Sequence, residues 1–179
     1  MDLPRRHNGR LRVLIVDDDA NLHGDYSRAL ALSRPQHQLA AARDALFGVT
    51  TAASGGDDPE FELVHAYDGA SALALVESGV ATGQRFSVAF VDMRMPPGWT
   101  GAETIRRLWD ADPTIQAVLC TAFSDFTWDK VLLEVGRSEG LHLLRKPFAP
   151  EQVRRFAEVL SKKWQLAHAP MSRLPDGPA

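Results

Sequence analysis

Cysteine is nearly absent from this sequence, whose 179 residues include a single one, Cys120. One thiol cannot form an intramolecular disulfide, so a disulfide-stabilised secreted domain is excluded. Long apolar runs are also missing. Runs such as Val13–Val16 and Val88–Val91 span four residues, whereas a membrane helix needs about 20. The first residues are basic but precede no apolar segment of secretory length, so we expect a cytoplasmic protein without a membrane span.

Net charge is small, at −3, and the composition is that of an ordinary globular protein, with 45% hydrophobic and 24% charged residues. The charge is unevenly placed: the segment from Arg145 onward carries +4, which leaves −7 on the rest of the chain. We interpret these cations, spread over a terminal helix and tail, as a solvated face, so we expect no direct contact with nucleic acid.

Short apolar segments alternate with amphipathic ones along the chain, which predicts an α/β fold with a parallel sheet covered by helices on both faces. The expected strands are Leu11–Val16, Phe61–Ala66, Ser87–Val91, Ile115–Cys120 and Leu141–Leu144. The first two expected helices begin after Asp19 and after Asp68. The other three span Thr100–Ala111, Trp128–Val135 and 150–167.

The predicted organisation is an N-terminal tail (1–10), one domain (11–167) and a disordered C-terminal tail (168–179). Residues 33–60 separate the first helix from the second strand by far more than the two to six residues usual in such folds. We therefore interpret 33–60 as an insertion that does not build the functional site.

Polar residues follow four of the expected strands. Asp17 and Asp18 follow the first, Asp92 the third, Thr121 the fourth and Lys146 the fifth. The carboxyl ends of parallel strands meet at one edge of a sheet, where ligands bind. Crowded carboxylates either have raised pKa values or bind a hard cation such as Mg²⁺. A divalent ion beside an ammonium and a hydroxyl is what phosphoryl transfer needs, and the remaining carboxylate would be the nucleophile.

At these positions the sequence closely resembles the receiver domain of two-component response regulators. The similarity spans about Leu11 to Trp164 and rests on four motifs, which are Val13–Asp19, Val91–Pro96 with Gly101, Leu119–Ala122 and Arg145–Phe148. The resemblance implies a flavodoxin-like sheet ordered 2-1-3-4-5. It also implies a signalling phosphoacceptor, rather than an ordinary enzyme, that catalyses its own phosphoryl transfer and dephosphorylation.

By this resemblance, Asp92 takes a phosphoryl group from a sensor histidine kinase or phosphotransfer protein and switches interactions around the fourth and fifth helices. The Mg²⁺ ligands implied are Asp17, Asp18, Asp92 and the backbone carbonyl of Arg94. The phosphoryl contacts implied are Thr121 and Lys146, and the coupling residues are Thr121, Leu143 and Pro147. The resemblance also suggests a cis bond before Pro147. The sequence of Met95–Trp99 is similar to that of receivers joined to sensor kinases or cyclic-dinucleotide output domains, but it does not identify the effector.

Three residues depart from the receiver pattern or modify it. Leu143 stands where receivers commonly carry an aromatic residue coupled to activation, so packing around Leu143 and its neighbours must carry any switch. Arg94 and Phe123 occupy the positions that border the path of attacking water, which predicts slow hydrolysis of the acyl phosphate.

Other interpretations stay open. Asp17-x-Asp19 with Thr121 and Lys146 also resembles haloacid-dehalogenase-type phosphatases, in which Asp17 would be the nucleophile. That family needs acidic metal ligands after the lysine, and this interpretation leaves Asp92 unexplained. The later acids are Glu151, Glu158 and Asp176, with no adjacent pair. A pseudo-receiver acting as a constitutive interaction module is a third interpretation.

Several residues also have structural interpretations. Asp19 is interpreted as a helix cap and Cys120 as a core residue. The six histidines show no zinc-ligand spacing. Trp164 extends the apolar stripe of the last helix, which fits a homodimer contact, a helical linker to another domain, or packing back onto the core.

Overall fold

The computed structural model describes residues 10–31, 60–122, 128–136 and 139–168. In these ranges five strands alternate with five helices. They are β1 (Leu11–Val16), α1 (Ala20–Ala31), β2 (Phe61–Ala66), α3 (Gly69–Thr82), β3 (Val88–Asp92), α4 (Gly101–Ala111), β4 (Gln116–Thr121), α5 (Trp128–Val135), β5 (Leu141–Arg145) and α6 (Pro150–His168). All the strand pairs are parallel, and the sheet order β2-β1-β3-β4-β5 confirms the expected α/β, flavodoxin-like topology.

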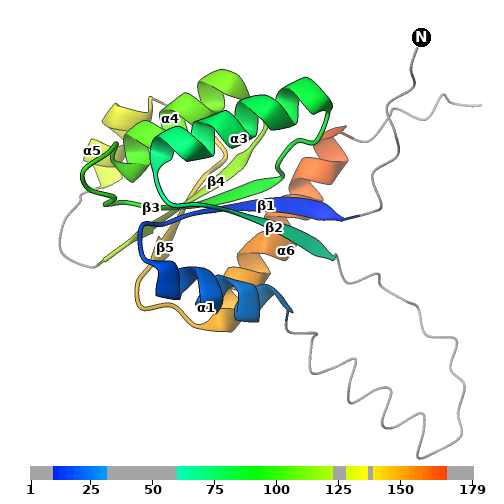
Figure 1. Cartoon of the computed structure of the whole chain (residues 1–179), viewed down its shortest axis with the longest axis horizontal. Helices are drawn as coiled ribbons and strands as arrows, with labels where there is room; N and C mark the ends of the chain where they lie inside the picture. Colours follow the sequence, from blue (N-terminus) through cyan, green and yellow to red (C-terminus); the bar gives the residue numbers. More distant parts are fainter. Residues whose placement is uncertain (1–9, 32–59, 123–127, 137–138, 169–179) are drawn as a thin grey trace, which may run out of the picture.

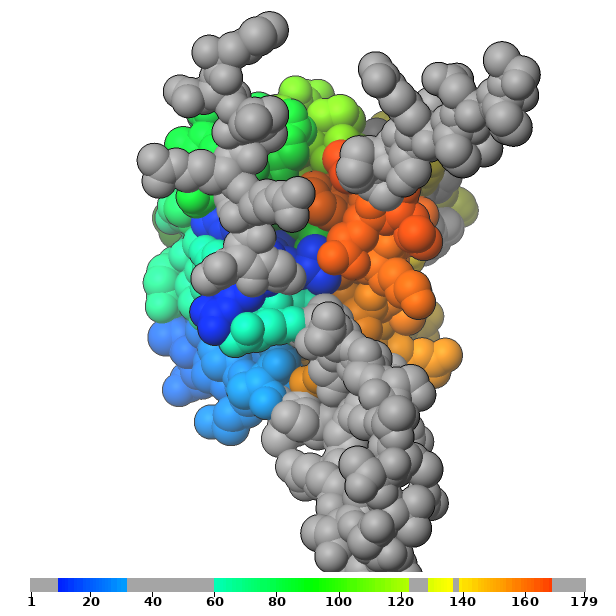
Figure 2. Space-filling model, turned by 90° about the vertical axis from the view of Figure 1, so that its right-hand side faces the viewer, coloured from blue at the N-terminus to red at the C-terminus, as the bar shows by residue number. Residues whose placement is uncertain are grey.

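Helices cover both faces of the sheet: α1 and α6 lie on one face, and α3, α4 and α5 on the other (Figure 1). Successive strand residues point to opposite faces, so β1 contributes to two apolar clusters. Leu14 and Val16 belong to the cluster under α3–α5, whereas Val13 and Ile15 belong to the cluster under α1 and α6. α6 contacts α1 on this face. In Figure 2, α6, in orange, lies at the right of the view and α1, in blue, at the lower left.

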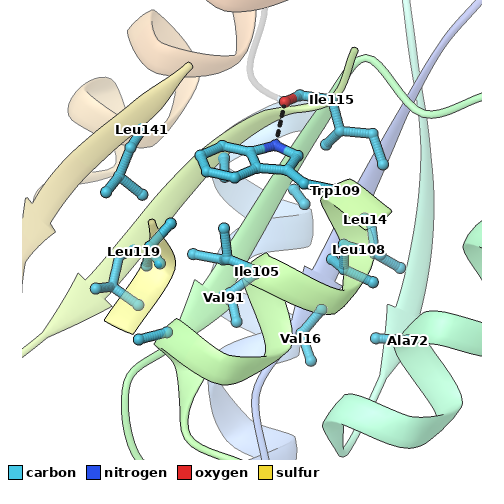
Figure 3. Packing of buried hydrophobic residues seen from close by; sticks show 14 of the residues in the cluster. Leu14, Val16, Ala72, Val91, Ile105, Leu108, Trp109, Ile115, Leu119 and Leu141 are labelled. Carbon is cyan, nitrogen blue, oxygen red and sulfur yellow. Dashed lines mark hydrogen bonds between the residues drawn. The ribbon is translucent and has the colours of Figure 1, made fainter. Parts of the chain in front are cut away.

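The cluster under α3–α5 centres on α4, whose apolar face carries Ile105, Leu108 and Trp109 (Figure 3). The indole Nε1 of Trp109 donates a hydrogen bond to the carbonyl oxygen of Ile115 at 2.8 Å. This bond ties the end of α4 to the residue before β4. The start of β4 is therefore held against the apolar face of α4.

Polar side chains define where the helices begin. Asp68 accepts from the backbone N–H of Ser71 at 2.7 Å, and Thr100 accepts from that of Glu103 at 3.1 Å, so both are N-caps. Asp19, directly before α1, accepts from the backbone N–H of Asn21 at 2.9 Å. This contact confirms the interpretation of Asp19 as a cap.

Boundaries at the strand ends differ from the expected ones by one residue. β3 runs to Asp92, β4 to Thr121 and β5 to Arg145, because the ladder pairs Asp92 with Cys120 and Thr121 with Arg145. Trp164 packs back onto the domain, since its Nε1 donates to the Thr114 hydroxyl at 3.2 Å. No described helix has the length and apolarity to span a membrane. The insertion and both predicted tails fall almost entirely outside the described residues.

Candidate functional site

Three strands place charged side chains at the same end of the sheet. Within β1 and β3, the alternation that directs Val13, Ile15, Val88 and Phe90 into the cluster under α1 and α6 continues to Asp17 and Asp92. In β5 the same alternation leads from Leu144 to Lys146. The three side chains therefore meet above the apolar cluster on the α1/α6 side of the sheet.

Lys146 joins the two carboxylates. Its Nζ lies 2.5 Å from Oδ1 of Asp92 and 2.9 Å from Oδ2 of Asp17. The Asp17 side chain is 2% exposed, that of Asp92 12% and that of Lys146 21%. Asp92 is thus the more accessible of the two carboxylates that share the ammonium, as a nucleophile needs to be.

Burial and charge act in opposite directions on these groups. Burial raises the pKa of Asp17, and the hydrogen bond from Lys146 opposes that rise without cancelling it. Burial lowers the pKa of Lys146, but its hydrogen bonds to Asp92 and Asp17 and the charges of both carboxylates outweigh burial and raise it. The Lys146 ammonium is stabilised by two anions. Asp17, by contrast, shares this one cation with Asp92 and is repelled by the negative charge of Asp92. Negative charge is therefore under-compensated here.

Backbone N–H groups fix the remaining carboxylate oxygens. Asp17 Oδ1 accepts from the N–H of Asp19 at 2.9 Å, and Asp92 Oδ2 accepts from the N–H of Arg94 at 2.8 Å. Each aspartate thus closes a turn with its own loop. All four carboxylate oxygens of the pair are held before any ligand arrives.

The loop after β3 depends on a glycine. The N–H of Gly101 donates to the carbonyl oxygen of Met93 at 2.9 Å. A Cβ added to Gly101 would lie 2.2 Å from the backbone oxygen of Asp92 and 2.8 Å from Cδ1 of Leu119. The start of α4 can therefore approach Asp92 this closely only because residue 101 has no side chain.

The other predicted site residues surround this pair without joining it. Asp18 lies next to Asp17 and is exposed, and Arg94 is exposed as well. Thr121, half-buried, donates from its hydroxyl to the carbonyl oxygen of Ala122 at 3.1 Å. The N–H of Lys146 donates to the carbonyl oxygen of Thr121 at 2.8 Å, so these two positions are linked through the backbone. Phe123 lies outside the described residues.

Two of the predicted coupling residues lie in or just after β5. Leu143 is half-buried and packs against the cluster that contains Val131 and Val135 of α5. The Lys146–Pro147 bond is cis, as the resemblance suggested, and so is Pro96–Pro97.

The donor chemistry of the site fits Mg²⁺. Hard oxygen donors suit this ion, and Asp17, Asp18 and Asp92 supply three carboxylates against the single ammonium of Lys146. The burial-raised pKa of Asp17 indicates that further positive charge would be stabilised at this place. Within the described ranges, no three Asp, Glu, His or Cys side chains already converge as metal ligands. Binding would therefore require the carboxylates to reorient around the ion.

Sequence reasoning missed residues that support the site from α1. Tyr26, which is buried, donates from its hydroxyl to Sγ of Cys120 at 3.2 Å. Burial raises the pKa of the Cys120 thiol to about 12, in agreement with the interpretation of Cys120 as a core residue. His23 contacts the backbone of Asp17 and the ring of His65. No sequence signal pairs residues this far apart.

Solved structures share this architecture. A Rhodopirellula baltica protein described as adenylate cyclase matches with a TM-score of 0.62 and 23% identity over 89% of this chain and 93% of its own. A CheY-like receiver domain protein from Methanospirillum hungatei JF-1 matches with a TM-score of 0.58 and 18% identity over 88% and 98%. The chain has the fold of a response-regulator receiver domain.

The receiver fold recurs in further matches. Vibrio cholerae CheY4, a chemotaxis response regulator, gives a TM-score of 0.54 and 24% identity over 84% of this chain and 98% of its own. No protein-family model matches the sequence, and no curated protein matches it significantly. The receiver assignment therefore rests on the fold, and the role of each residue is argued from its own contacts.

Proposed function

We propose that this chain is a phosphoacceptor receiver domain, in which Asp92 takes a phosphoryl group from a sensor histidine kinase or phosphotransfer protein. The observation that carries the proposal is the position of Lys146, whose ammonium contacts both Asp92 and the buried Asp17 at the carboxyl ends of three strands. Such a cation beside an accessible carboxylate is suited to bind and neutralise a phosphoryl group. The receiver fold places this cluster at the sheet edge where ligands of doubly wound folds bind.

In the proposed reaction, a carboxylate oxygen of Asp92 forms a bond to phosphorus while the bond from phosphorus to the donor's imidazole nitrogen breaks. The electron pair of the broken bond stays on that nitrogen. Lys146 keeps the phosphoryl oxygens partly neutralised, and the N–H of Arg94 orients the carboxylate. Mg²⁺, when bound by Asp17, Asp18, Asp92 and the carbonyl of Arg94, supplies further neutralising charge. Asp17 is less suited to act as nucleophile because it is buried.

Output is proposed to run through the face around α5 and α6. If Thr121 turns from the Ala122 carbonyl toward a phosphorylated Asp92, the end of β4 moves against Leu143 and its contacts with α5. Both helices expose apolar side chains, Leu133 on α5 and Val159 and Leu166 on α6, at 84%, 58% and 71%. A homodimer or an effector that binds one of the two states more tightly would shift the equilibrium between them.

Labelling with a small phosphodonor tests the phosphoacceptor role. Wild type should gain a phosphate-affinity gel shift that requires Mg²⁺, Asp92→Asn should not, and Asp18→Asn should need more Mg²⁺ because one ligand charge is lost. Equal labelling of wild type and Asp92→Asn would refute the proposal. Glu139→Gln is the matched control, since Glu139 is an exposed acid before β5 and outside the site.

A further inference from the structure

A pair of histidines lies behind the acidic site, between α1 and β2. His23, on the first turns of α1, is 6% exposed. Its Nε2 lies 2.8 Å from the backbone carbonyl oxygen of Asp17, and its Nδ1 lies 2.7 Å from Nδ1 of His65 on β2. The ring of Tyr67 covers His23, with the two ring centroids 4.4 Å apart. His23 therefore connects the loop that carries the acidic residues to the edge strand of the sheet.

The hydrogen-bond partners determine where the protons lie. A carbonyl oxygen can only accept, so Nε2 of His23 carries the proton of that bond. In a neutral ring the Nδ1 of His23 is then the acceptor, and Nδ1 of His65 is the donor. This assignment agrees with the lowered pKa of His65, because burial favours the neutral form of its ring. The chain of donors runs from His65 to His23 to Asp17.

The contact with Asp17 is to its main chain, which leaves the carboxylate for the site. The N–H of Asp17 donates to the carbonyl oxygen of Ala66 at 3.2 Å. The peptide group between Asp17 and Asp18 is planar, so a hydrogen bond on its carbonyl also sets the orientation of the Asp18 N–H. With both sides of the Asp17 backbone held, its carboxylate can point to Lys146.

We propose that His23, supported by His65, is a positioning residue that fixes the Asp17–Asp18 peptide group and thereby prepares the two carboxylates for Mg²⁺. This inference rests on the proposed function, because Mg²⁺ is the ligand that gives the positioning its consequence. Groups one step removed from a metal ligand commonly change metal affinity by about 10–100-fold when replaced. We expect an effect at the lower end of that range, since His23 acts through the backbone.

Two substitutions separate the contact with Asp17 from the contact with His65. In His23→Gln the side-chain amide can place a donor near the position of Nε2 and keep the bond to Asp17. In His23→Asn the shorter amide can accept from His65 near the position of Nδ1 but does not reach Asp17. Both variants exchange a buried ring for an amide, so a purely structural role would affect the two alike.

Isothermal titration with MgCl₂ and amide hydrogen exchange of Asp18 and Asp19 give the two readouts. His23→Asn should bind Mg²⁺ about tenfold more weakly than wild type and exchange these amides faster, and His23→Gln should stay near wild type in both. Equal Mg²⁺ affinity and equal exchange in folded His23→Asn and wild type would overturn the inference. If wild type itself fails to bind Mg²⁺, the metal part of the proposed function is wrong. The exchange comparison then decides the positioning role alone.

Discussion

Gly101→Ala is the substitution whose effect the geometry defines most sharply. The added Cβ would lie 2.2 Å from the backbone oxygen of Asp92, whereas ordinary contacts begin at 3.4 Å. Asp92 or the start of α4 must therefore move by about 1.2 Å. Overpacking of this kind costs about 1–3 kcal/mol of stability. A reacting group misplaced by about 1 Å can lose about 100-fold in rate.

The assay compares initial rates of labelling by a small phosphodonor with urea unfolding of the same samples. Gly98→Ala is the matched control, because its Cβ would meet the Met95 carbonyl oxygen at 3.5 Å, an ordinary contact in the same loop. Gly101→Ala should fold, unfold at lower urea and label far more slowly, while Gly98→Ala should label as wild type does. A folded Gly101→Ala protein that labels at the wild-type rate would refute the claim that the close approach of α4 positions Asp92.

Three further changes have defined outcomes. Trp109→Phe removes the donor to the buried Ile115 carbonyl and should lower the free energy of unfolding by about 1–3 kcal/mol. Trp99→Phe, at a half-buried position, is the control and should lose less. Equal losses in urea titrations would contradict this. Burial and His23 lower the pKa of His65 in the folded state. The contribution of His65 to the free energy of unfolding should therefore be complete above pH 6.5 and fall as the pH drops below it. His65→Gln should reduce that fall, part of which persists through His142, whose pKa is also lowered; an unchanged pH profile would count against the argument. Shortening the insertion by residues 50–59 should leave labelling at Asp92 intact, and its loss in a folded variant would place the insertion in the site.

Much of the fold could be predicted because the sequence pattern is regular. The five strands are short apolar runs, and turn-forming or charged residues follow them. The alternation of these runs with amphipathic helical segments therefore predicted an α/β fold. The one-residue shifts at β3, β4 and β5 arise because strand ends are set by inter-strand hydrogen bonds, such as the pairing of Asp92 with Cys120. A single-sequence pattern contains no information on that register.

The site was predictable in part for the same reason. Asp17, Asp92 and Lys146 could be brought together from their places after parallel strands. The direction of the Thr121 hydroxyl could not be predicted, because it depends on a side-chain torsion. The link from His65 through His23 to Asp17 could not be predicted either, because it joins residues that are distant in the sequence. For Trp164 the amphipathic stripe allowed an outward or an inward orientation. The hydrogen bond to Thr114 shows the inward one.

The central claim, that Asp92 is the phosphoacceptor, is tested most directly by locating the modified residue. After reaction with a small phosphodonor and Mg²⁺, borohydride reduces an aspartyl phosphate to homoserine, which mass spectrometry of peptides can place in the sequence. The account predicts homoserine at position 92 and an unmodified Asp17. Reduction at Asp17, or at no aspartate of the site while wild type is labelled, would contradict it.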